Sequence, residues 1–192
     1  MGIFGSKKKL IEKQKKLAEE SLNNSRKVVI SGDIDNTAAY STIMHIMRWY
    51  NQDASRPITI YINSSGGNIN SGIAIYDVIK TLLCDVSTIC IGSANGLAAL
   101  LLSAGTPGKR FAVKSSKVSI GKFEYDKPKD KETAKAIKQL IDKIYHNLEN
   151  ESNMTFKQVK KKSKRNLASD DALKYGMVDN VIFDEVVEPY IE

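Results

Sequence analysis

The sequence is poor in the residues that most catalytic and metal chemistry requires. Its 192 residues include only two cysteines, two histidines, one tryptophan and four prolines. Two thiols, Cys84 and Cys90, cannot form a disulfide framework, so the sequence favours a reducing compartment and buried structural roles for both. Neither cysteine lies near a histidine at metal-ligand spacing, and we therefore expect no metal site and no cofactor.

Long apolar runs are also missing. The longest, at residues 97–102, falls well short of the roughly 18 residues that a transmembrane helix needs, which excludes a membrane span. The net charge of +7 is concentrated at residues 7–16 and 157–165. No aromatic residue is interleaved with either cluster, so neither offers a stacking platform for bases. We expect a solvated basic surface and no nucleic-acid partner.

Beyond a break at residues 23–25, short apolar runs alternate with amphipathic stretches, which is typical of an α/β fold. We expect one domain over residues 26–192, preceded by a basic arm at residues 1–25. The pattern predicts strands at residues 28–30, 58–62, 86–91, 110–113, 117–120 and 181–183. It predicts helices at residues 69–83, 94–103, 129–148, 155–164 and 169–175, and a further helix capped by Asp35 or Asn36.

Two of these helices have a clear pattern of apolar spacing. The helix after Asn36 has a predicted apolar face at three- and four-residue spacing: Tyr40, Ile43, Met44 and Met47. The helix at residues 129–148 aligns five apolar residues on one side: Ile137, Leu140, Ile141, Ile144 and Leu148.

Two strand–glycine–helix junctions are the best candidates for a site. They are residues 61–67 (YINSSGG) and residues 91–99 (IGSANGLAA). Glycines let the chain turn sharply and leave backbone N–H groups pointing outward at the start of each helix. Two such junctions side by side can form an oxyanion hole, although phosphate-binding loops and plain tight turns use the same residue types.

Five segments resemble the Clp protease proteolytic subunit family, in order and at almost matching spacing from about residue 28 to residue 183. They are YINSSGG (61–67), GIAIYD (72–77), DVSTICIG (85–92), AGTPGKRF (104–111) and YGMVD (175–179). The resemblance implies a head made of a spiral of βαβ units, a fold shared with crotonases, and a projecting handle helix at about residues 122–150. It also implies heptameric rings, an axial pore at residues 1–25, and an AAA+ ATPase partner that feeds in polypeptides.

The resemblance fails at the catalytic triad. Gly96 stands at the position of the family nucleophile, Gly121 at that of the histidine and Lys164 at that of the aspartate. Because no acidic residue lies between Glu151 and Asp170, a shift of the alignment does not restore the aspartate. The positions that match the oxyanion donors are Gly67 and Leu97. We therefore expect an inactive ring subunit, similar to the ClpR class.

Two other functions remain open. A serine-type peptidase with a non-standard nucleophile would need Ser93, the nearest hydroxyl, together with His45 or His146, which the family pattern places away from Gly96. A crotonase-like acyl-CoA enzyme would share the fold and a two-amide oxyanion hole, but that family usually has a longer chain with further C-terminal helices.

The resemblance also implies an ATPase-docking cleft. The matching positions are Thr59, Tyr61, Thr81, Ile89, Ile91, Phe111, Val113 and Ile182. Because Thr59 and Thr81 replace residues that are usually aromatic in the family, we expect weakened docking of the ATPase.

The segment after Gly121 also differs from the family pattern. Near residues 162–165 the sequence lacks the Asp–Arg pairs that join opposite rings in the family. We therefore expect a homo-heptamer as a single ring, or mixed barrels with active ClpP subunits. No signal or transit peptide is recognisable, and the expected compartment is the plastid stroma or apicoplast for a processed chain and the cytoplasm otherwise.

Overall fold

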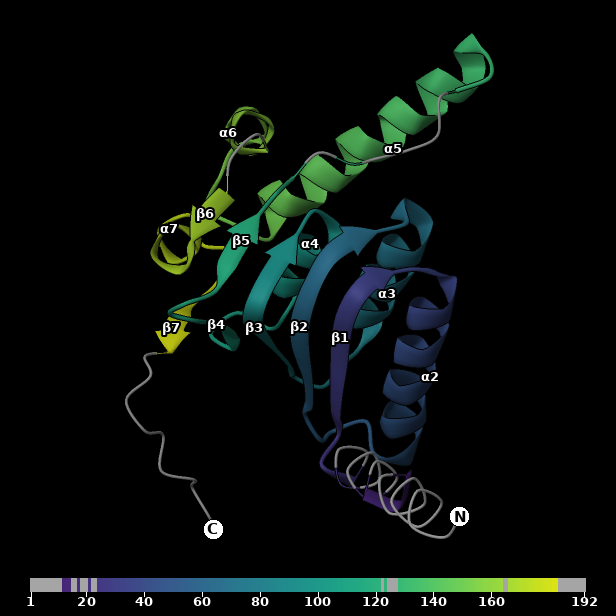
Figure 1. Ribbon diagram of the computed structural model, residues 1–192, viewed down its shortest axis with the longest axis vertical. Helices are drawn as coiled ribbons and strands as arrows, with labels where there is room; N and C mark the ends of the chain where they lie inside the picture. The colour runs from purple at the N-terminus through teal and green to yellow at the C-terminus, as the bar shows by residue number, and fades with distance from the viewer. Residues whose placement is uncertain are drawn as a thin grey trace, which may run out of the picture.

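The computed structural model describes residues 12–14, 17, 21, 24–121, 123, 128–163 and 166–182 (Figure 1). Most of the predicted basic arm, the candidate triad residue Lys164 and the predicted strand end at Phe183 lie outside these residues. Five strands form a parallel sheet in the order β1 (Lys27–Ile34), β2 (Ile58–Gly67), β3 (Val86–Asn95), β4 (Arg110–Val113) and β7 (Asn180–Ile182). β5 (Lys117–Ser119) pairs in parallel with the end of β3, and β6 (Asn166–Ala168) pairs antiparallel with β5.

Helices connect β1 to β2, β2 to β3 and β3 to β4, as the predicted spiral of βαβ units requires. They are α2 (Asn36–Gln52), α3 (Ile69–Thr81), α4 (Leu97–Ser103), α5 (Lys131–Asn150), α6 (Phe156–Lys162) and α7 (Ser169–Lys174). All seven residues of α4 are buried. This helix is apolar on every side because it lies in the centre of the core, against β2, β3 and α3. The predicted α/β fold class is confirmed.

Strands β2 and β3 run further than the apolar runs predict. β2 was expected to end at Ile62 and β3 at Ile91, but they continue to Gly67 and Asn95. The pairing register shifts between Ile62 and Ser64, opposite the stretch of β3 that contains Gly92 with φ of 93°. The irregularity interrupts the hydrophobic alternation, which is why the sequence pattern stops there although the pairing resumes.

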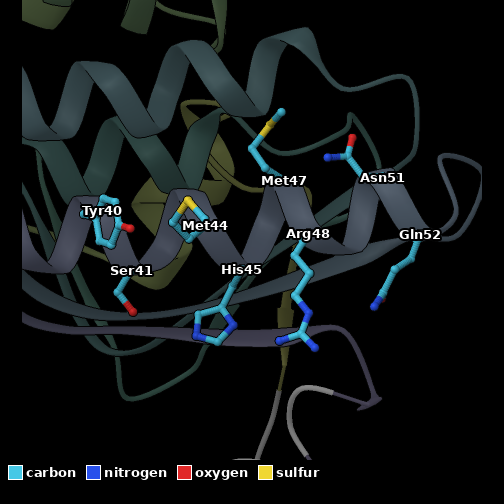
Figure 2. Close-up of a pocket in the computed structure, with 8 residues that line it drawn as sticks. All are labelled: Tyr40, Ser41, Met44, His45, Met47, Arg48, Asn51 and Gln52. Carbon is cyan, nitrogen blue, oxygen red and sulfur yellow. The ribbon is translucent and has the colours of Figure 1, made fainter.

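The predicted apolar face of α2 is wrong for three of its four residues, whereas the fourth, Ile43, is half-buried and packs against the core. The helix buries Ala39, Thr42, Ile46 and Trp49, and leaves Tyr40 69%, Met44 50% and Met47 37% exposed. Figure 2 shows Tyr40, Met44 and Met47 on the outside of the helix. Apolar residues occur on more than one face of α2, so the sequence alone allows two different faces to pack on the core. The face with Ile46 and Trp49 packs against β1 and α3. The predicted N-cap is confirmed, because the Asp35 carboxylate accepts the Ala38 N–H at 2.7 Å.

The long helix α5 is buried only at its C-terminal end. Ile144, Tyr145 and Leu148 are buried there, whereas Ile137, Leu140 and Ile141 of the predicted face are half-buried. Figure 1 shows the N-terminal half of α5 extending beyond the sheet. Within the described part of the chain, no element fully buries the apolar face of the N-terminal half of α5.

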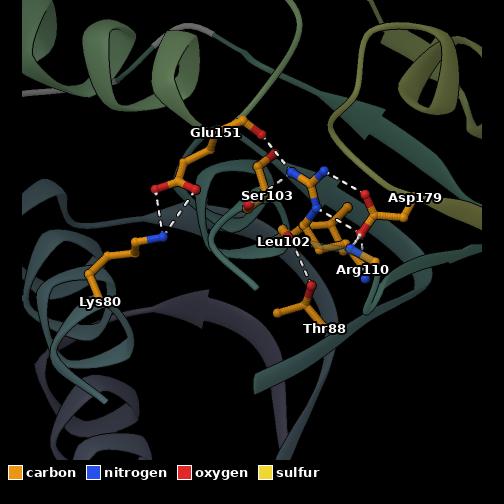
Figure 3. A network of polar contacts seen from close by, with 8 residues as sticks. Lys80, Thr88, Leu102, Ser103, Arg110, Glu151 and Asp179 are labelled. Carbon is orange, nitrogen blue, oxygen red and sulfur yellow. Dashed lines mark hydrogen bonds and ion pairs between the residues drawn. The ribbon is translucent and has the colours of Figure 1, made fainter. Parts of the chain in front are cut away.

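A buried arginine joins the end of α5 to the sheet (Figure 3). The Nε and Nη2 atoms of Arg110 on β4 donate to the two carboxylate oxygens of Asp179, at 3.0 and 2.6 Å. Its Nη1 donates to the carbonyl oxygen of Glu151 at 2.6 Å. The Glu151 carboxylate in turn accepts the Tyr76 hydroxyl of α3 at 2.8 Å and pairs with Lys80. One guanidinium thus ties together β4, the turn before β7, α5 and α3.

The Asp179 carboxylate has a pKa below its usual value. Burial alone would raise the pKa, but hydrogen bonds from the Arg110 side chain and from the Arg110 and Gly108 N–H groups outweigh burial and lower it. A carboxyl group with a lowered native pKa stabilises the fold above its unfolded pKa of about 3.9. That contribution is lost as the pH falls through the native pKa.

Asp179→Asn is expected to lower the free energy of unfolding by roughly 3–5 kcal/mol at pH 7, because it leaves the Arg110 charge buried without a charge of opposite sign beside it. It should also flatten the loss of stability below about pH 4. Urea unfolding followed by circular dichroism at several pH values measures both effects. Asp85→Asn, which breaks the exposed pair with Lys109, is the matched control and should cost at most about 1 kcal/mol. Equal costs for the two variants would contradict the role given to Arg110.

Candidate functional site

The two glycine junctions meet at one cavity of about 540 Å³. The β2–α3 junction contributes Ser65, Gly66, Gly67 and Asn68, and the β3–α4 junction contributes Gly96 and Leu97. The remaining walls are Asp33, Ile34 and Asp35 at the end of β1, and Phe123. The junctions lie at the carboxyl ends of parallel strands, which is where ligands bind in open α/β sheets.

Gly96 occupies a backbone conformation that side-chain-bearing residues rarely adopt. It is the N-cap of α4, with φ of 55° and ψ of −115°. Such a strained strand-to-helix turn is the form in which many hydrolases present a nucleophile. A Cβ at Gly96 would lie 3.8 Å from Phe123 Cε1 and 4.0 Å from the Ile120 carbonyl oxygen, so the space for a small side chain remains. The turn is kept, but it presents no side chain.

Gly121 lies directly against Gly96. The Gly96 N–H donates to the Ser119 carbonyl oxygen at 2.8 Å, and Gly121 follows two residues later with φ of 67°. A Cβ at Gly121 would stand 3.2 Å from the Gly96 nitrogen and 3.3 Å from its Cα. A side chain at 121 would therefore press against the Gly96 backbone, which would have to give by a few tenths of an ångström. Lys164, the third candidate triad position, lies outside the described residues.

The predicted oxyanion positions share the cavity wall with Gly96. Gly67 has φ of 149°, and a Cβ there would lie 2.5 Å from the Ile34 carbonyl oxygen, so only glycine fits. Leu97 is the first residue of α4, where the N–H has no acceptor within the helix. The structure thus brings Gly67 and Leu97 together as predicted, while their action as donors stays a prediction.

The alternative nucleophile and bases lie elsewhere. Ser93 is half-buried on β3, and its N–H donates to Asn63 Oδ1 at 3.2 Å. His45 packs against Trp49 on α2, with ring centroids 5.5 Å apart. His146 on α5 stacks on Phe156 at 4.4 Å and contacts Glu149 Oε2 at 3.0 Å. None of these three residues lines the cavity beside Gly96.

The two cysteines are free and buried, which confirms the predicted structural roles. Burial raises the pKa of both thiols, so neither is an activated nucleophile. Within the described ranges, no group of three or more His, Cys, Asp or Glu side chains could hold a metal ion. No helix in that part of the chain is long and apolar enough to cross a membrane.

Seven of the eight predicted docking positions lie on one face of the sheet. In the parallel register Tyr61 pairs with Ile89 and Ile89 with Phe111, while Val113 pairs with Ile182. Thr59 and Ile91 share this face because they lie two residues from Tyr61 and Ile89. Thr81 does not, since it ends α3, where its hydroxyl donates to the Val78 carbonyl oxygen. Figure 1 shows α3 and α4 behind the sheet, so the described residues leave the front face without a helix.

A larger hollow of about 690 Å³ lies on the outer side of α2, away from the junctions. All the residues that line it come from that one helix, and they include Tyr40, Met44, Met47 and Arg48 (Figure 2). Because no second element brings polar groups toward it, this hollow is a surface for contact rather than a site for chemistry.

Sequence reasoning missed five residues of the cavity: Asp33, Ile34, Asp35, Asn68 and Phe123. The two aspartates flank Ile34 at the carboxyl end of β1, and the rule that carboxyl ends of parallel strands meet would have found them. No comparable pattern in the sequence predicts that Phe123 lines the cavity. Its place beside Gly96 depends on the turn after β5, which no local pattern specifies.

A parallel βαβ sheet with two glycine junctions opening on one cavity defines the class of this protein as a spiral α/β fold. The Clp protease family model matches residues 11–185, and the chain belongs to this family. It is 34% identical over 168 residues to ATP-dependent Clp protease proteolytic subunit 3 of Synechococcus sp. (strain CC9902), covering 84% of each chain. It is 33% identical, with the same coverage, to proteolytic subunit 2 of Prochlorococcus marinus subsp. pastoris (strain CCMP1986 / NIES-2087 / MED4). The family assignment confirms the predicted resemblance and favours it over a crotonase-like enzyme.

Alanine substitutions should separate backbone strain from steric overlap at the site. Gly67→Ala is expected to lower the free energy of unfolding by more than about 3 kcal/mol, because its Cβ would overlap the Ile34 backbone. Gly96→Ala should cost roughly 1–3 kcal/mol from the strained φ and ψ alone. Gly32→Ala is the control, since its φ of 75° is strained but its surroundings are open. Urea unfolding measures all three, and a Gly67→Ala cost no larger than that of Gly32→Ala would contradict the overlap.

Proposed function

We propose that this chain is a ring subunit of a Clp-type complex that no longer hydrolyses peptide bonds and has a structural or regulatory role, as in the ClpR class. The observation that carries the proposal is the contact between Gly96 and Gly121. At the positions matching the nucleophile and its base there are two glycines, with a Cβ at Gly121 only 3.2 Å from the Gly96 nitrogen. A serine–histidine hydrogen bond has neither of the side chains it needs, and a side chain at 121 would crowd the Gly96 backbone.

The chemistry supports loss of activity at each step. A hydroxyl is a poor nucleophile without an adjacent base, and the base needs an orienting acid. Lysine at position 164 would set a positive charge where an imidazolium must be stabilised. Because triad members act as a unit, losing all three leaves at most the help of the oxyanion donors at Gly67 and Leu97.

Two exposed apolar surfaces support ring assembly. One is the open face of the sheet, with Tyr61, Ile89 and Phe111, and the other is the outer face of α2, with Tyr40 and Met44. The two surfaces do not overlap, so a contact between them in neighbouring subunits would be head-to-tail, the kind of contact that closes into rings. The relatives are named as subunits of an ATP-dependent protease, which agrees with assembly. The proposed assembly is a homo-heptamer, or a mixed barrel with active subunits.

The open face also supports contact with an AAA+ Clp ATPase, at clefts that the ring contact leaves open between neighbouring subunits. Six of its seven matching positions are apolar or aromatic, and Thr59 is the exception. Because Thr59 and Thr81 lack the aromatic rings expected there, the proposed docking is weaker by a few kcal/mol at most, at about 1.5–3 kcal/mol for each large side chain buried.

Incubation with a fluorogenic peptide and a serine-reactive fluorophosphonate probe tests the loss of activity. We expect no hydrolysis above the buffer rate and no labelling of the chain. The triple variant Gly96→Ser, Gly121→His, Lys164→Asp should stay inactive as well, because a side chain at 121 would press on the Gly96 backbone. Labelling of the unmodified chain that disappears in Ser93→Ala would instead establish a peptidase with a non-standard nucleophile.

Native mass spectrometry, on the chain alone and mixed with an active Clp proteolytic subunit from the same source, tests assembly. We expect heptamers of this chain or mixed rings. Met44→Asp should weaken the association constant of each subunit contact at least tenfold, or by about 1.4 kcal/mol, because it places a charge in the proposed contact, and the spectrum should shift toward smaller species. Leu173→Asp, which alters a residue on α7 that is 40% exposed, is the control and should assemble normally. Monomers in both samples would defeat the ring-subunit proposal.

A further inference from the structure

A groove of about 320 Å³ runs along β1 where this strand meets α2. It is lined by five consecutive residues of the strand, 27–31, and by residues of the helix that include Ser41, His45 and Trp49. Ser41 and His45 also line the larger hollow on the outer side of α2, so the two depressions are continuous. Figure 2 shows Ser41, His45 and Arg48 on the same side of the helix. The groove and the hollow therefore form one elongated surface.

β1 is an edge strand of the sheet. In the described part of the chain it pairs only with β2, and Figure 1 shows it at one edge of the sheet and β7 near the other. A groove lined by consecutive residues of an edge strand lies along its free backbone N–H and C=O groups. An extended segment binds to such an edge by adding a strand. Because Val29 on this strand is 44% exposed, the groove fits an extended segment with apolar side chains.

The surface along the groove is basic. Lys27 lines the groove and Arg48 lines the adjoining hollow, whereas neither depression contains an aspartate or a glutamate. Among the ion pairs of the described residues, none involves Lys27 or Arg48. Complementary charge is what selects one partner over another at such a surface. The two cations therefore favour an acidic occupant.

The chain itself contains a segment with this chemistry. Residues 183–192 (FDEVVEPYIE) follow β7 and lie outside the described residues. They include four acidic residues and no lysine or arginine. The other side chains are mostly phenylalanine, valine, tyrosine and isoleucine, which favour extended strands. The segment complements the groove in both charge and hydropathy.

The register of the sheet favours the groove of a second copy over that of the same chain. Five residues stand at the same level across the five parallel strands: Ile30, Ile62, Cys90, Ala112 and Val181. Four strand spacings of about 4.8 Å separate β7 from β1, or about 19 Å. Crossing that distance at about 3.3 Å per residue would use roughly six residues and leave too few to fill the groove. A neighbouring copy whose α2 packs on the open face of the sheet would bring its groove closer to β7.

We propose that residues 183–192 of one copy bind as an extended segment in the groove between β1 and α2 of a second copy, with their carboxylates near Lys27 and Arg48. The position of the second copy rests on the proposed ring assembly. The chemistry of the contact does not, because it depends only on the groove and the segment. The segment would then join neighbouring subunits beside the packing of the sheet face on α2.

Disulfide trapping in the full chain tests the contact. The double variant Ser41→Cys, Val187→Cys places one thiol in the groove and one in the segment, while Cys84 and Cys90 are buried. With oxidised glutathione we expect a ladder of interchain disulfides on a non-reducing gel. Asp77→Cys, Val187→Cys is the matched control, because Asp77 is exposed on α3 outside the groove. Its initial rate of crosslinking should be at least about tenfold lower, since no contact raises the local thiol concentration.

Charge reversal tests the chemistry of the contact. Adding Lys27→Glu and Arg48→Glu to the double-cysteine chain should lower the initial crosslinking rate about fivefold at low salt, because two exposed ion pairs become repulsions. Adding Glu185→Lys and Glu188→Lys to that variant should restore the rate. Equal melting curves by circular dichroism confirm that all variants are folded.

The outcomes separate this inference from the proposed function. Crosslinks confined to single chains, a control that reacts as fast as the groove variant, or a rate that charge reversal leaves unchanged would each overturn the proposed contact. Native mass spectrometry of the unmodified chain reports the assembly independently. Rings without a disulfide ladder would overturn the contact and leave the ring proposal. A ladder without closed rings would overturn ring assembly and leave the contact, and monomers without a ladder would overturn both.

Discussion

The buried guanidinium of Arg110 is the interaction on which the arrangement of the chain most depends. A parallel sheet positions its own strands through backbone pairing, but α5 begins after a long excursion and has no pairing to fix it. Arg110 supplies that link, because it binds Asp179 with one edge and the carbonyl oxygen of Glu151 with the other. The position of α5 in turn holds Tyr145 against Phe123, and Phe123 forms one wall of the cavity beside Gly96. A polar contact in the core therefore shapes a pocket several elements away.

Much of the fold was predictable because its signals are local. Apolar runs gave the order of strands and helices, and Asp35 capped α2 as the side-chain rule requires. The face of α2 was not predictable in the same way. Tyr40, Met44 and Met47 have the spacing of a core stripe, but Ile46 and Trp49 form a second stripe that fills the space against β1 and α3. Only the shape of the surrounding core decides between two stripes of similar hydrophobicity.

The residues of the candidate site also fall into those that a local sequence signal predicts and those that it does not. Its glycines were visible in the sequence because each turn needs a backbone that few other residues tolerate, as at Gly67 against Ile34. Gly67, Gly96 and Leu97 line one cavity and Gly121 lies against Gly96, while the roles that the family resemblance implies for them stay predictions. The two carboxylates and Phe123 come from separate elements, β1 and the segment after β5, and carry no shared spacing. Seven of the eight predicted docking positions lie on one face of the sheet. Thr81 does not, because it belongs to a helix and so cannot follow the two-residue alternation of a strand.

The contact between Gly96 and Gly121 bears on how easily an ancestral activity could return. A lost side chain is restored by a single codon change, and the strained turn at Gly96 would accept one at modest cost. Position 121 is different, because a Cβ there would stand 3.2 Å from the Gly96 nitrogen and 3.3 Å from its Cα, so the Gly96 backbone would have to shift by a few tenths of an ångström. Under the proposed function, a return of the base at 121 therefore needs an adjustment of the backbone beside Gly96 as well as a change of residue, which makes this position harder to reverse than Gly96.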